Sequence, residues 1–195
     1  MEGAGPAATD LIRPRHPKSV YYTELERAIL VVGSDTFGCV LVLGHGDSMP
    51  AAIRDETPNA KVLTTARNVR DGRAVADWYT ESGPKLGPIH GSVNAAGIAP
   101  PSHFVTPIDE VPDEDWERTI GINLTGLMLC MREQVRAMKK SKASGSVVNI
   151  TSTADLSGFA NGGPYSAAKW GVNGLTWSVA KETAKSGVRI TRVAP

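Results

Sequence analysis

The sequence predicts an α/β protein in which a parallel β-sheet is covered by helices on both faces. Short, nearly continuous runs of aliphatic and β-branched residues alternate along the chain with longer amphipathic stretches. Strands that are apolar throughout are typical of sheets buried on both faces, and alternation with helices favours parallel order. We therefore expect a doubly wound, three-layer fold with the sheet in the middle.

Six runs are the candidate strands: 28–32, 39–44, 61–66, 89–94, 146–151 and 188–193. Three stretches between them are the candidate helices: 71–82, 112–140 and 163–186. The second stretch begins at Pro112 with an acidic first turn and ends in basic residues, which suits the helix dipole. The third ends before Gly187, a residue type that commonly terminates helices.

Composition narrows the class of protein. The chain has 195 residues, of which 41% are hydrophobic and 21% charged, so we expect a flexible tail over 1–24 and one domain over 25–195. A net charge of +1 gives no electrostatic basis for binding nucleic acid or a membrane surface. No apolar run is long enough to cross a bilayer and no secretion signal is visible, so the expected location is the cytoplasm. The four histidines show no metal-ligand spacing, and we predict no metal site.

The pair Tyr165 and Lys169 is the central candidate for chemistry. Residues four apart share one face of a helix, so the two side chains are neighbours. A phenol has a reference pKa near 10, and an ammonium beside it favours the phenolate. Such a pair can supply the proton donor or acceptor that interconversion of an alcohol and a carbonyl requires. An isolated pair of this kind is more often a solvated surface contact. Whether this pair is catalytic therefore has to be judged from other residues.

Two polar residues bear on that decision. Ser152 directly follows the strand at 146–151, at the end where ligands bind in open α/β sheets, although a loop serine that caps backbone groups is the alternative. Asn123 lies inside a predicted helix, where asparagine is disfavoured unless it has a role. It either binds a water at the rear of the site or is a tolerated polar residue.

Four motifs, in this order and spacing, resemble the short-chain dehydrogenase/reductase family: NAAG (94–97), NLTG (123–126), VVNITS (147–152) and YSAAK (165–169). The resemblance runs from about Lys61 to the last residue. It implies a Rossmann-type domain, incomplete at both ends, that transfers hydride between NAD or NADP and an alcohol/carbonyl substrate. It also implies a homodimer or homotetramer, assembled through the stretch 112–140 and the helix that follows Pro164.

The resemblance implies a role for each site residue. Tyr165 would be the acid/base, and Lys169 would tune the tyrosine and bind the nicotinamide ribose. Ser152 would orient the substrate, and Asn123 would complete a proton relay. The implied cofactor-binding residues are Asn94, Ala95, Ala96, Gly97, Asn68, Val69, Tyr165 and Lys169, with Gly33 and Gly38 as the candidate glycine-rich turn.

The N-terminal part departs from the family pattern. The spacing of Gly33 and Gly38 differs from that of the family's glycine-rich turn, and strand-like residues resume at Cys39, which leaves no room for a helix. Asn68 stands where the family usually carries an aspartate. The alternative function is therefore a catalytically inactive relative that binds a nucleotide weakly or acts as a protein-interaction module.

Overall fold

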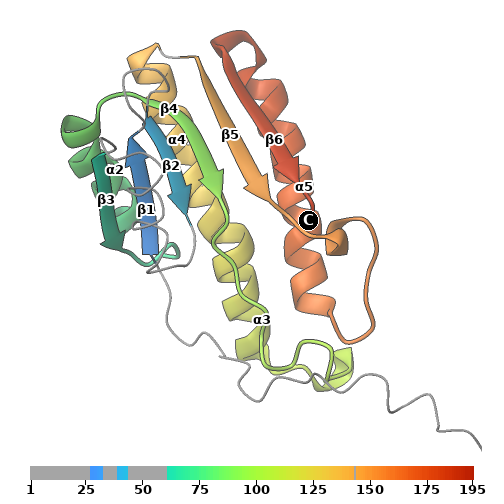
Figure 1. Cartoon of the computed structure of the whole chain (residues 1–195). Helices are drawn as coiled ribbons and strands as arrows, with labels where there is room; N and C mark the ends of the chain where they lie inside the picture. The colour runs from blue at the N-terminus through green and yellow to red at the C-terminus, as the bar shows by residue number, and fades with distance from the viewer. Residues whose placement is uncertain (1–26, 33–38, 44–60, 143) are drawn as a thin grey trace, which may run out of the picture.

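The computed structural model describes residues 27–32, 39–43, 61–142 and 144–195. The predicted tail, residues 1–24, lies outside this range, as do Gly33 and Gly38. Six strands form one sheet with the order β3-β1-β2-β4-β5-β6 (Figure 1). They are β1 (Arg27–Val32), β2 (Cys39–Leu43), β3 (Lys61–Ala66), β4 (Ile89–Asn94), β5 (Gly145–Ile150) and β6 (Val188–Val193). Each agrees with a predicted run to within one residue at either end.

The direction of β1 corrects the expectation of a wholly parallel sheet. Strands β2, β4, β5 and β6 are parallel, as predicted. Strand β1 is antiparallel to both of its neighbours, β2 and β3. Only residues 33–38 separate β1 from β2, whereas a parallel crossover needs about a dozen residues or more. A parallel arrangement of β1 and β2 as neighbours is therefore ruled out by the length of the connection.

The long helices lie on one side of the sheet. Helices α2 (Gly72–Leu86), α4 (Leu127–Ser141) and α5 (Gly163–Thr183) all lie behind the strands in the view of Figure 1. The described residues thus form two layers, and the predicted third layer has no helix among them. The core lies between sheet and helices, where Met131, Met138, Val147 and Val172 are almost completely buried. None of the described helices is long and apolar enough to cross a membrane.

Local sequence explains where the helices begin and end. The Asp71 carboxylate caps α2 by accepting from the backbone N–H groups of Arg73 and Ala74. This helix continues past the predicted end at residue 82, through Pro84, and stops before Gly87, whose φ of 82° favours glycine. The predicted helix 112–140 is three pieces: α3 (Asp113–Ile120), a π-helical turn (Gly121–Gly126) and α4. Short 3₁₀ turns occupy Ile108–Glu110, Thr153–Asp155 and Ala184–Ser186.

A buried ladder of polar side chains joins the two layers. The amides of Asn94 and Gln134 exchange two hydrogen bonds, of 3.0 and 2.7 Å. Asn94 Nδ2 also donates to Asn149 Oδ1 at 2.8 Å, and Asn149 Nδ2 donates to the Thr176 hydroxyl at 2.9 Å. These four residues come from β4, α4, β5 and α5, so the ladder fixes the relative positions of all four elements.

Candidate active site

A cavity of about 630 Å³ opens where the parallel strands β4, β5 and β6 end. Its walls include residues 95, 97–101, 103 and 105 after β4, Thr151 and Ser152 after β5, and Pro195 after β6. Helix α5 adds Tyr165 and Lys169. In open α/β sheets, the carboxyl ends of the strands are where ligands bind, and the predicted residues Ser152, Tyr165 and Lys169 meet there.

The first turns of α5 place the Tyr165–Lys169 pair. Pro164 stands at the start of this helix, where its fixed φ suits helical geometry and its missing N–H costs nothing. Lys169 Nζ lies 5.4 Å from the centroid of the Tyr165 ring, which confirms the predicted proximity of the two side chains. Lys169 is only 6% exposed, and its ammonium donates to the Ile150 carbonyl oxygen at 3.1 Å.

The electrostatics of Lys169 are set by two opposing effects. Burial lowers the pKa of Lys169, because the ammonium loses solvation, and the nearby Asp155 carboxylate raises it. Of the three N–H groups on Nζ, one bonds Ile150, and the other two have no protein acceptor within the described ranges. The cation is therefore available to a neighbouring oxygen in the cavity.

Ser152 caps a backbone turn and also lies in the wall of the cavity. It caps the 3₁₀ turn Thr153–Asp155, and its Oγ accepts from the Ala154 backbone N–H at 3.3 Å. It is also half-buried in the cavity wall. The cap uses an acceptor site of the hydroxyl, so the hydroxyl proton stays available as a donor.

Asn123 holds the segment that follows β4. It lies in the π-helical turn and is 1% exposed. Its Oδ1 accepts from the Ile98 backbone N–H and its Nδ2 donates to the Ile98 carbonyl oxygen, both at 2.8 Å. A Cβ on Gly97 would lie 3.3 Å from Asn123 Oδ1 and 3.8 Å from Lys169 Nζ, so a residue without a side chain suits this close approach. The side chain of Asn123 thus positions the floor of the cavity by bonding both backbone groups of Ile98.

The remaining predicted cofactor residues fall into three groups: the segment 94–97, the pair Asn68 and Val69, and the pair Gly33 and Gly38. Ala95 and Gly97 line the cavity, whereas Ala96 packs against the core and the side chain of Asn94 belongs to the buried ladder. Asn68 is exposed, and its Oδ1 accepts from the Arg70 backbone N–H at 2.8 Å.

Val69 is 6% exposed and packs in the core, so its side chain does not face a ligand. The third group, Gly33 and Gly38, lies outside the described residues. Where the adenosine half of a cofactor would lie stays a prediction.

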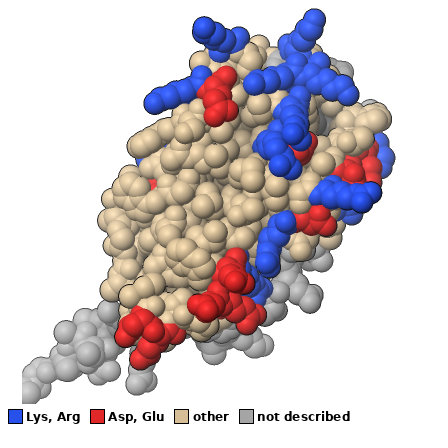
Figure 2. All heavy atoms as spheres, turned by 180° about the vertical axis from the view of Figure 1, so that it is seen from behind, with Lys and Arg blue, Asp and Glu red and all other residues tan. Residues whose placement is uncertain are grey.

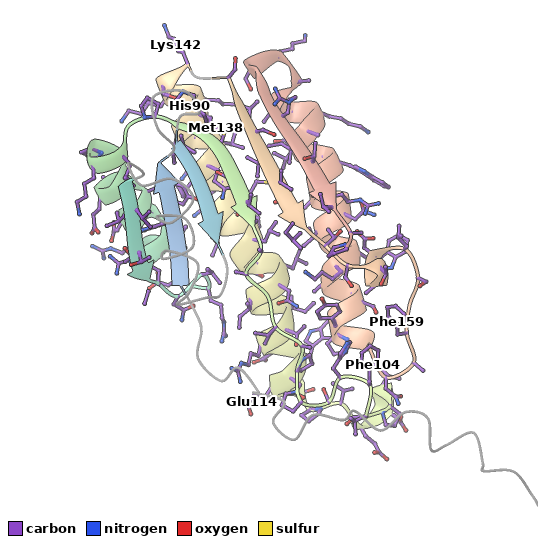
Figure 3. All side chains as sticks on the ribbon, viewed as in Figure 1. His90, Phe104, Glu114, Met138, Lys142 and Phe159 are labelled. Carbon is purple, nitrogen blue, oxygen red and sulfur yellow. The ribbon has the colours of Figure 1, made fainter. Side chains whose placement is uncertain are left out.

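Sequence reasoning missed His103, which lines the same cavity. Its ring centroid lies 4.9 Å from that of Tyr165, and burial lowers the pKa of His103, which favours the neutral imidazole. Phe104 and Phe159 lie beside each other near the start of α5 (Figure 3), with ring centroids 6.0 Å apart. These side chains come from irregular loops, where no periodic pattern marks a residue's orientation. Within the described residues no group of three or more His, Cys, Asp or Glu side chains is placed so that it could hold a metal ion.

Comparison with known proteins extends these observations. The family model described as short chain dehydrogenase matches residues 33–195. The short-chain dehydrogenase/reductase ABA4 of Pyricularia oryzae is 36% identical over 136 residues, which cover 70% of this chain and 49% of that protein. The chain spans about half the length of the curated relatives it matches first.

Solved structures agree. A levodione reductase superposes with a TM-score of 0.72 and 32% identity over 80% of this chain and 60% of that one. A metagenomic short-chain oxidoreductase in complex with NADP gives a TM-score of 0.69 and 30% identity, with 80% of this chain and 69% of that chain covered. The part of the fold that carries the cavity is thus shared with proteins of known structure.

Proposed function

This chain belongs to the short-chain dehydrogenase family, and from that premise we propose that it transfers hydride between NAD or NADP and an alcohol/carbonyl substrate. The observation that carries the proposal is the convergence of Ser152, Tyr165 and Lys169 on one cavity at the carboxyl ends of three parallel strands. A hydroxyl donor, a phenol and a buried ammonium within one cavity are what this proton transfer requires.

The residues present fit the nicotinamide half of the cofactor. Lys169 offers two N–H donors that have no acceptor in the described part of the chain, which suits the two hydroxyls of a ribose. A Cβ on Gly97 would lie 3.8 Å from Lys169 Nζ, so the missing side chain leaves room beside the ammonium. The bound cofactor would supply or accept the hydride.

The protein side chains would then handle the proton and the oxygen. Ser152 donates a hydrogen bond to the substrate oxygen and holds it within reach of Tyr165. Tyr165 gives its phenolic proton to the developing alkoxide when a carbonyl is reduced, and takes it back when an alcohol is oxidised. The Lys169 ammonium, 5.4 Å from the Tyr165 ring centroid, stabilises the tyrosinate that forms. Asn123 keeps Ile98 and the cavity floor in place.

We further propose that the chain forms a homodimer or homotetramer through α4 and α5. Trp170 and Trp177 are seven residues apart on α5, which places them on one face, and they are 50% and 59% exposed. Seen from the helix side, Figure 2 shows a broad area without charged side chains over this part of the molecule. Large exposed apolar areas on soluble proteins mark interaction sites.

Nucleotide binding by the purified chain tests the proposed function. NAD(H) and NADP(H) are titrated in a thermal unfolding assay, and a ligand at a hundred times its Kd adds about 2.7 kcal/mol of stability. We expect one nucleotide pair to raise the Tm. Tyr165→Phe should keep that shift while lowering kcat with a carbonyl substrate by about 10²- to 10⁴-fold. A folded sample that responds to neither nucleotide would refute the proposal.

The second candidate function is a module that binds a nucleotide or a protein without catalysis. It is supported by β1, which lies inside the sheet and is antiparallel to both of its neighbours. A nucleotide-induced rise in Tm without turnover of any alcohol or carbonyl substrate, and without an effect of Tyr165→Phe, would favour this module.

A further inference from the structure

A buried ion pair joins the 3₁₀ turn after β5 to strand β6, beside the cavity. Asp155 ends the 3₁₀ turn that Ser152 caps, and its side chain is completely buried. Arg192, on β6, donates from Nη1 to Asp155 Oδ2 at 2.8 Å and is itself 23% exposed. A buried carboxylate needs such a partner, because an unpaired buried charge is strongly destabilising.

This ion pair anchors the turn that carries Ser152. The backbone N–H of Asp155 donates to the Ser152 carbonyl oxygen at 2.9 Å, so the two residues are held in one tight turn. On the other side of Ser152, Thr151 donates from its N–H and from its hydroxyl to the Val193 carbonyl oxygen, at 2.8 and 3.1 Å. Strand β6 therefore holds the segment at two points, one before and one after Ser152.

The turn that Asp155 ends also packs against α5, the helix that carries Lys169. Titratable or charged groups come near this lysine from four elements. Tyr165 lies beside it on the same helix, Asp155 lies on the turn, Arg192 on β6 binds Asp155, and His103 on the loop after β4 packs on Tyr165. Asp155 is the carboxylate in this group. Its Oδ1 is buried and has no hydrogen-bond partner in the described part of the chain, so Arg192 binds only one of the two carboxylate oxygens. Burial lowers the pKa of Lys169 and Asp155 opposes that effect.

We propose that Asp155, held by Arg192, is a positioning residue of the active site, which fixes the turn carrying Ser152 and supplies the anionic counterpart of the Lys169 ammonium. Its functional meaning rests on the proposed hydride transfer, because that reaction uses both Ser152 and the charged form of Lys169. The electrostatic part is a property of the folded chain and can be measured without turnover.

The test follows Lys169 directly. The full chain is labelled with ¹³C at the lysine Cε, and the Lys169 signal is identified by its loss in Lys169→Arg. Asp155→Asn should move the titration midpoint of this signal to lower pH, since the opposing anion is gone. Arg192→Met should move it to higher pH, since the Asp155 carboxylate is then uncompensated. Opposite directions distinguish charge effects from general loosening.

Glu133→Gln is the matched control. Glu133 is a carboxylate on α4 whose side chain is 10% exposed, and it is paired with Arg132 and Arg136 at 3.0 and 2.7 Å. Its neutralisation removes the same charge from a largely buried carboxylate outside the cavity wall, so the Lys169 midpoint should stay unchanged. An unchanged midpoint in Asp155→Asn, or an equal shift in Glu133→Gln, would overturn the proposal.

Kinetics complete the test. In an active chain Asp155→Asn should lower kcat about ten- to a hundredfold and move the alkaline limb of the pH profile in the direction of the NMR midpoint. An unmoved pH profile in an active chain would contradict the positioning role. A wild-type chain that binds neither nucleotide refutes the proposed function, while the NMR midpoints still decide the electrostatic role of Asp155. If Asp155→Asn fails to fold, the direction of the shift in Arg192→Met decides instead.

Discussion

The strands β4 to β6 and the strands β1 to β3 belong to one sheet, yet they differ in how the chain connects them. Helices cross over between β4, β5 and β6, so these strands are parallel and their carboxyl ends meet at the cavity. Strand β1 runs opposite to both of its neighbours, so its carboxyl end lies at the far edge. Similar apolar strands thus contribute differently, and the connections decide which of them reach the site.

The buried ladder offers the largest test of this comparison. Asn149→Ala should lower the free energy of unfolding by about 3–5 kcal/mol, because Asn94 and Thr176 lose a buried partner and a cavity forms. Thr64→Ala, at an exposed position of β3, should cost less than about 0.5 kcal/mol. Urea unfolding followed by circular dichroism measures both. Equal losses would mean that the two regions are held together in the same way.

For two glycines in helical segments, substitution by alanine should change the free energy of unfolding in opposite directions. A Cβ on Gly126 would lie 2.7 Å from Val69 Cγ2 and 3.3 Å from the Val69 carbonyl oxygen, so Gly126→Ala should cost about 1–3 kcal/mol. Gly174, on α5, has no atom within 4 Å of such a Cβ, and Gly174→Ala should gain about 0.5–1 kcal/mol. Thermal unfolding should therefore shift down in the first variant and up in the second. A shift in the same direction for both would show that the close packing around Gly126 does not limit stability.

The smallest expected effect is the loss of folding stability that comes from burying the Lys169 ammonium. Burial lowers the pKa of Lys169, so between its folded value and 10.5 the unfolded chain binds a proton that the folded chain does not, and stability rises with pH. Lys169→Met should therefore add about 1 kcal/mol at pH 7, and this gain should shrink as the pH approaches 10.5. Urea titrations at several pH values measure it. Lys181→Met, at an exposed position of α5, should change little at any pH, and a matching profile there would remove Lys169 as the cause.

Strands and the central pair were predictable from the sequence because their signals are local. Apolar runs mark the strands, and the four-residue spacing places Tyr165 beside Lys169. The direction of β1 was not predictable from the sequence, because strand propensity says nothing about orientation. The length of the connection between β1 and β2 becomes informative only once the two strands are known to pair. The extent of α2 was missed because Pro84 is tolerated within it.

The surroundings of the site were also beyond the sequence. Asp155 and Arg192 are 37 residues apart, and only the folded chain brings them together. His103 comes from an irregular loop, and only the fold places it in the cavity wall. No spacing rule connects such residues, since each belongs to a different element. The motifs therefore predict the side chains proposed to react, but they do not predict the surrounding residues that hold those side chains in place.

The π-helical turn Gly121–Gly126 determines which side chains of α4, the helix that follows it, face the sheet. In an α-helix each residue advances by about 100°, so loss of one residue here would rotate α4 by about that angle around its axis. Met131, Gln134 and Met138, now almost completely buried, would turn away from the sheet while Asn123 stayed at the cavity. Changes in length at this place are compatible with both requirements in steps of about seven or eleven residues, which make two or three nearly complete turns. The same short turn that aims one amide at the active site thus fixes how long this helix is allowed to be.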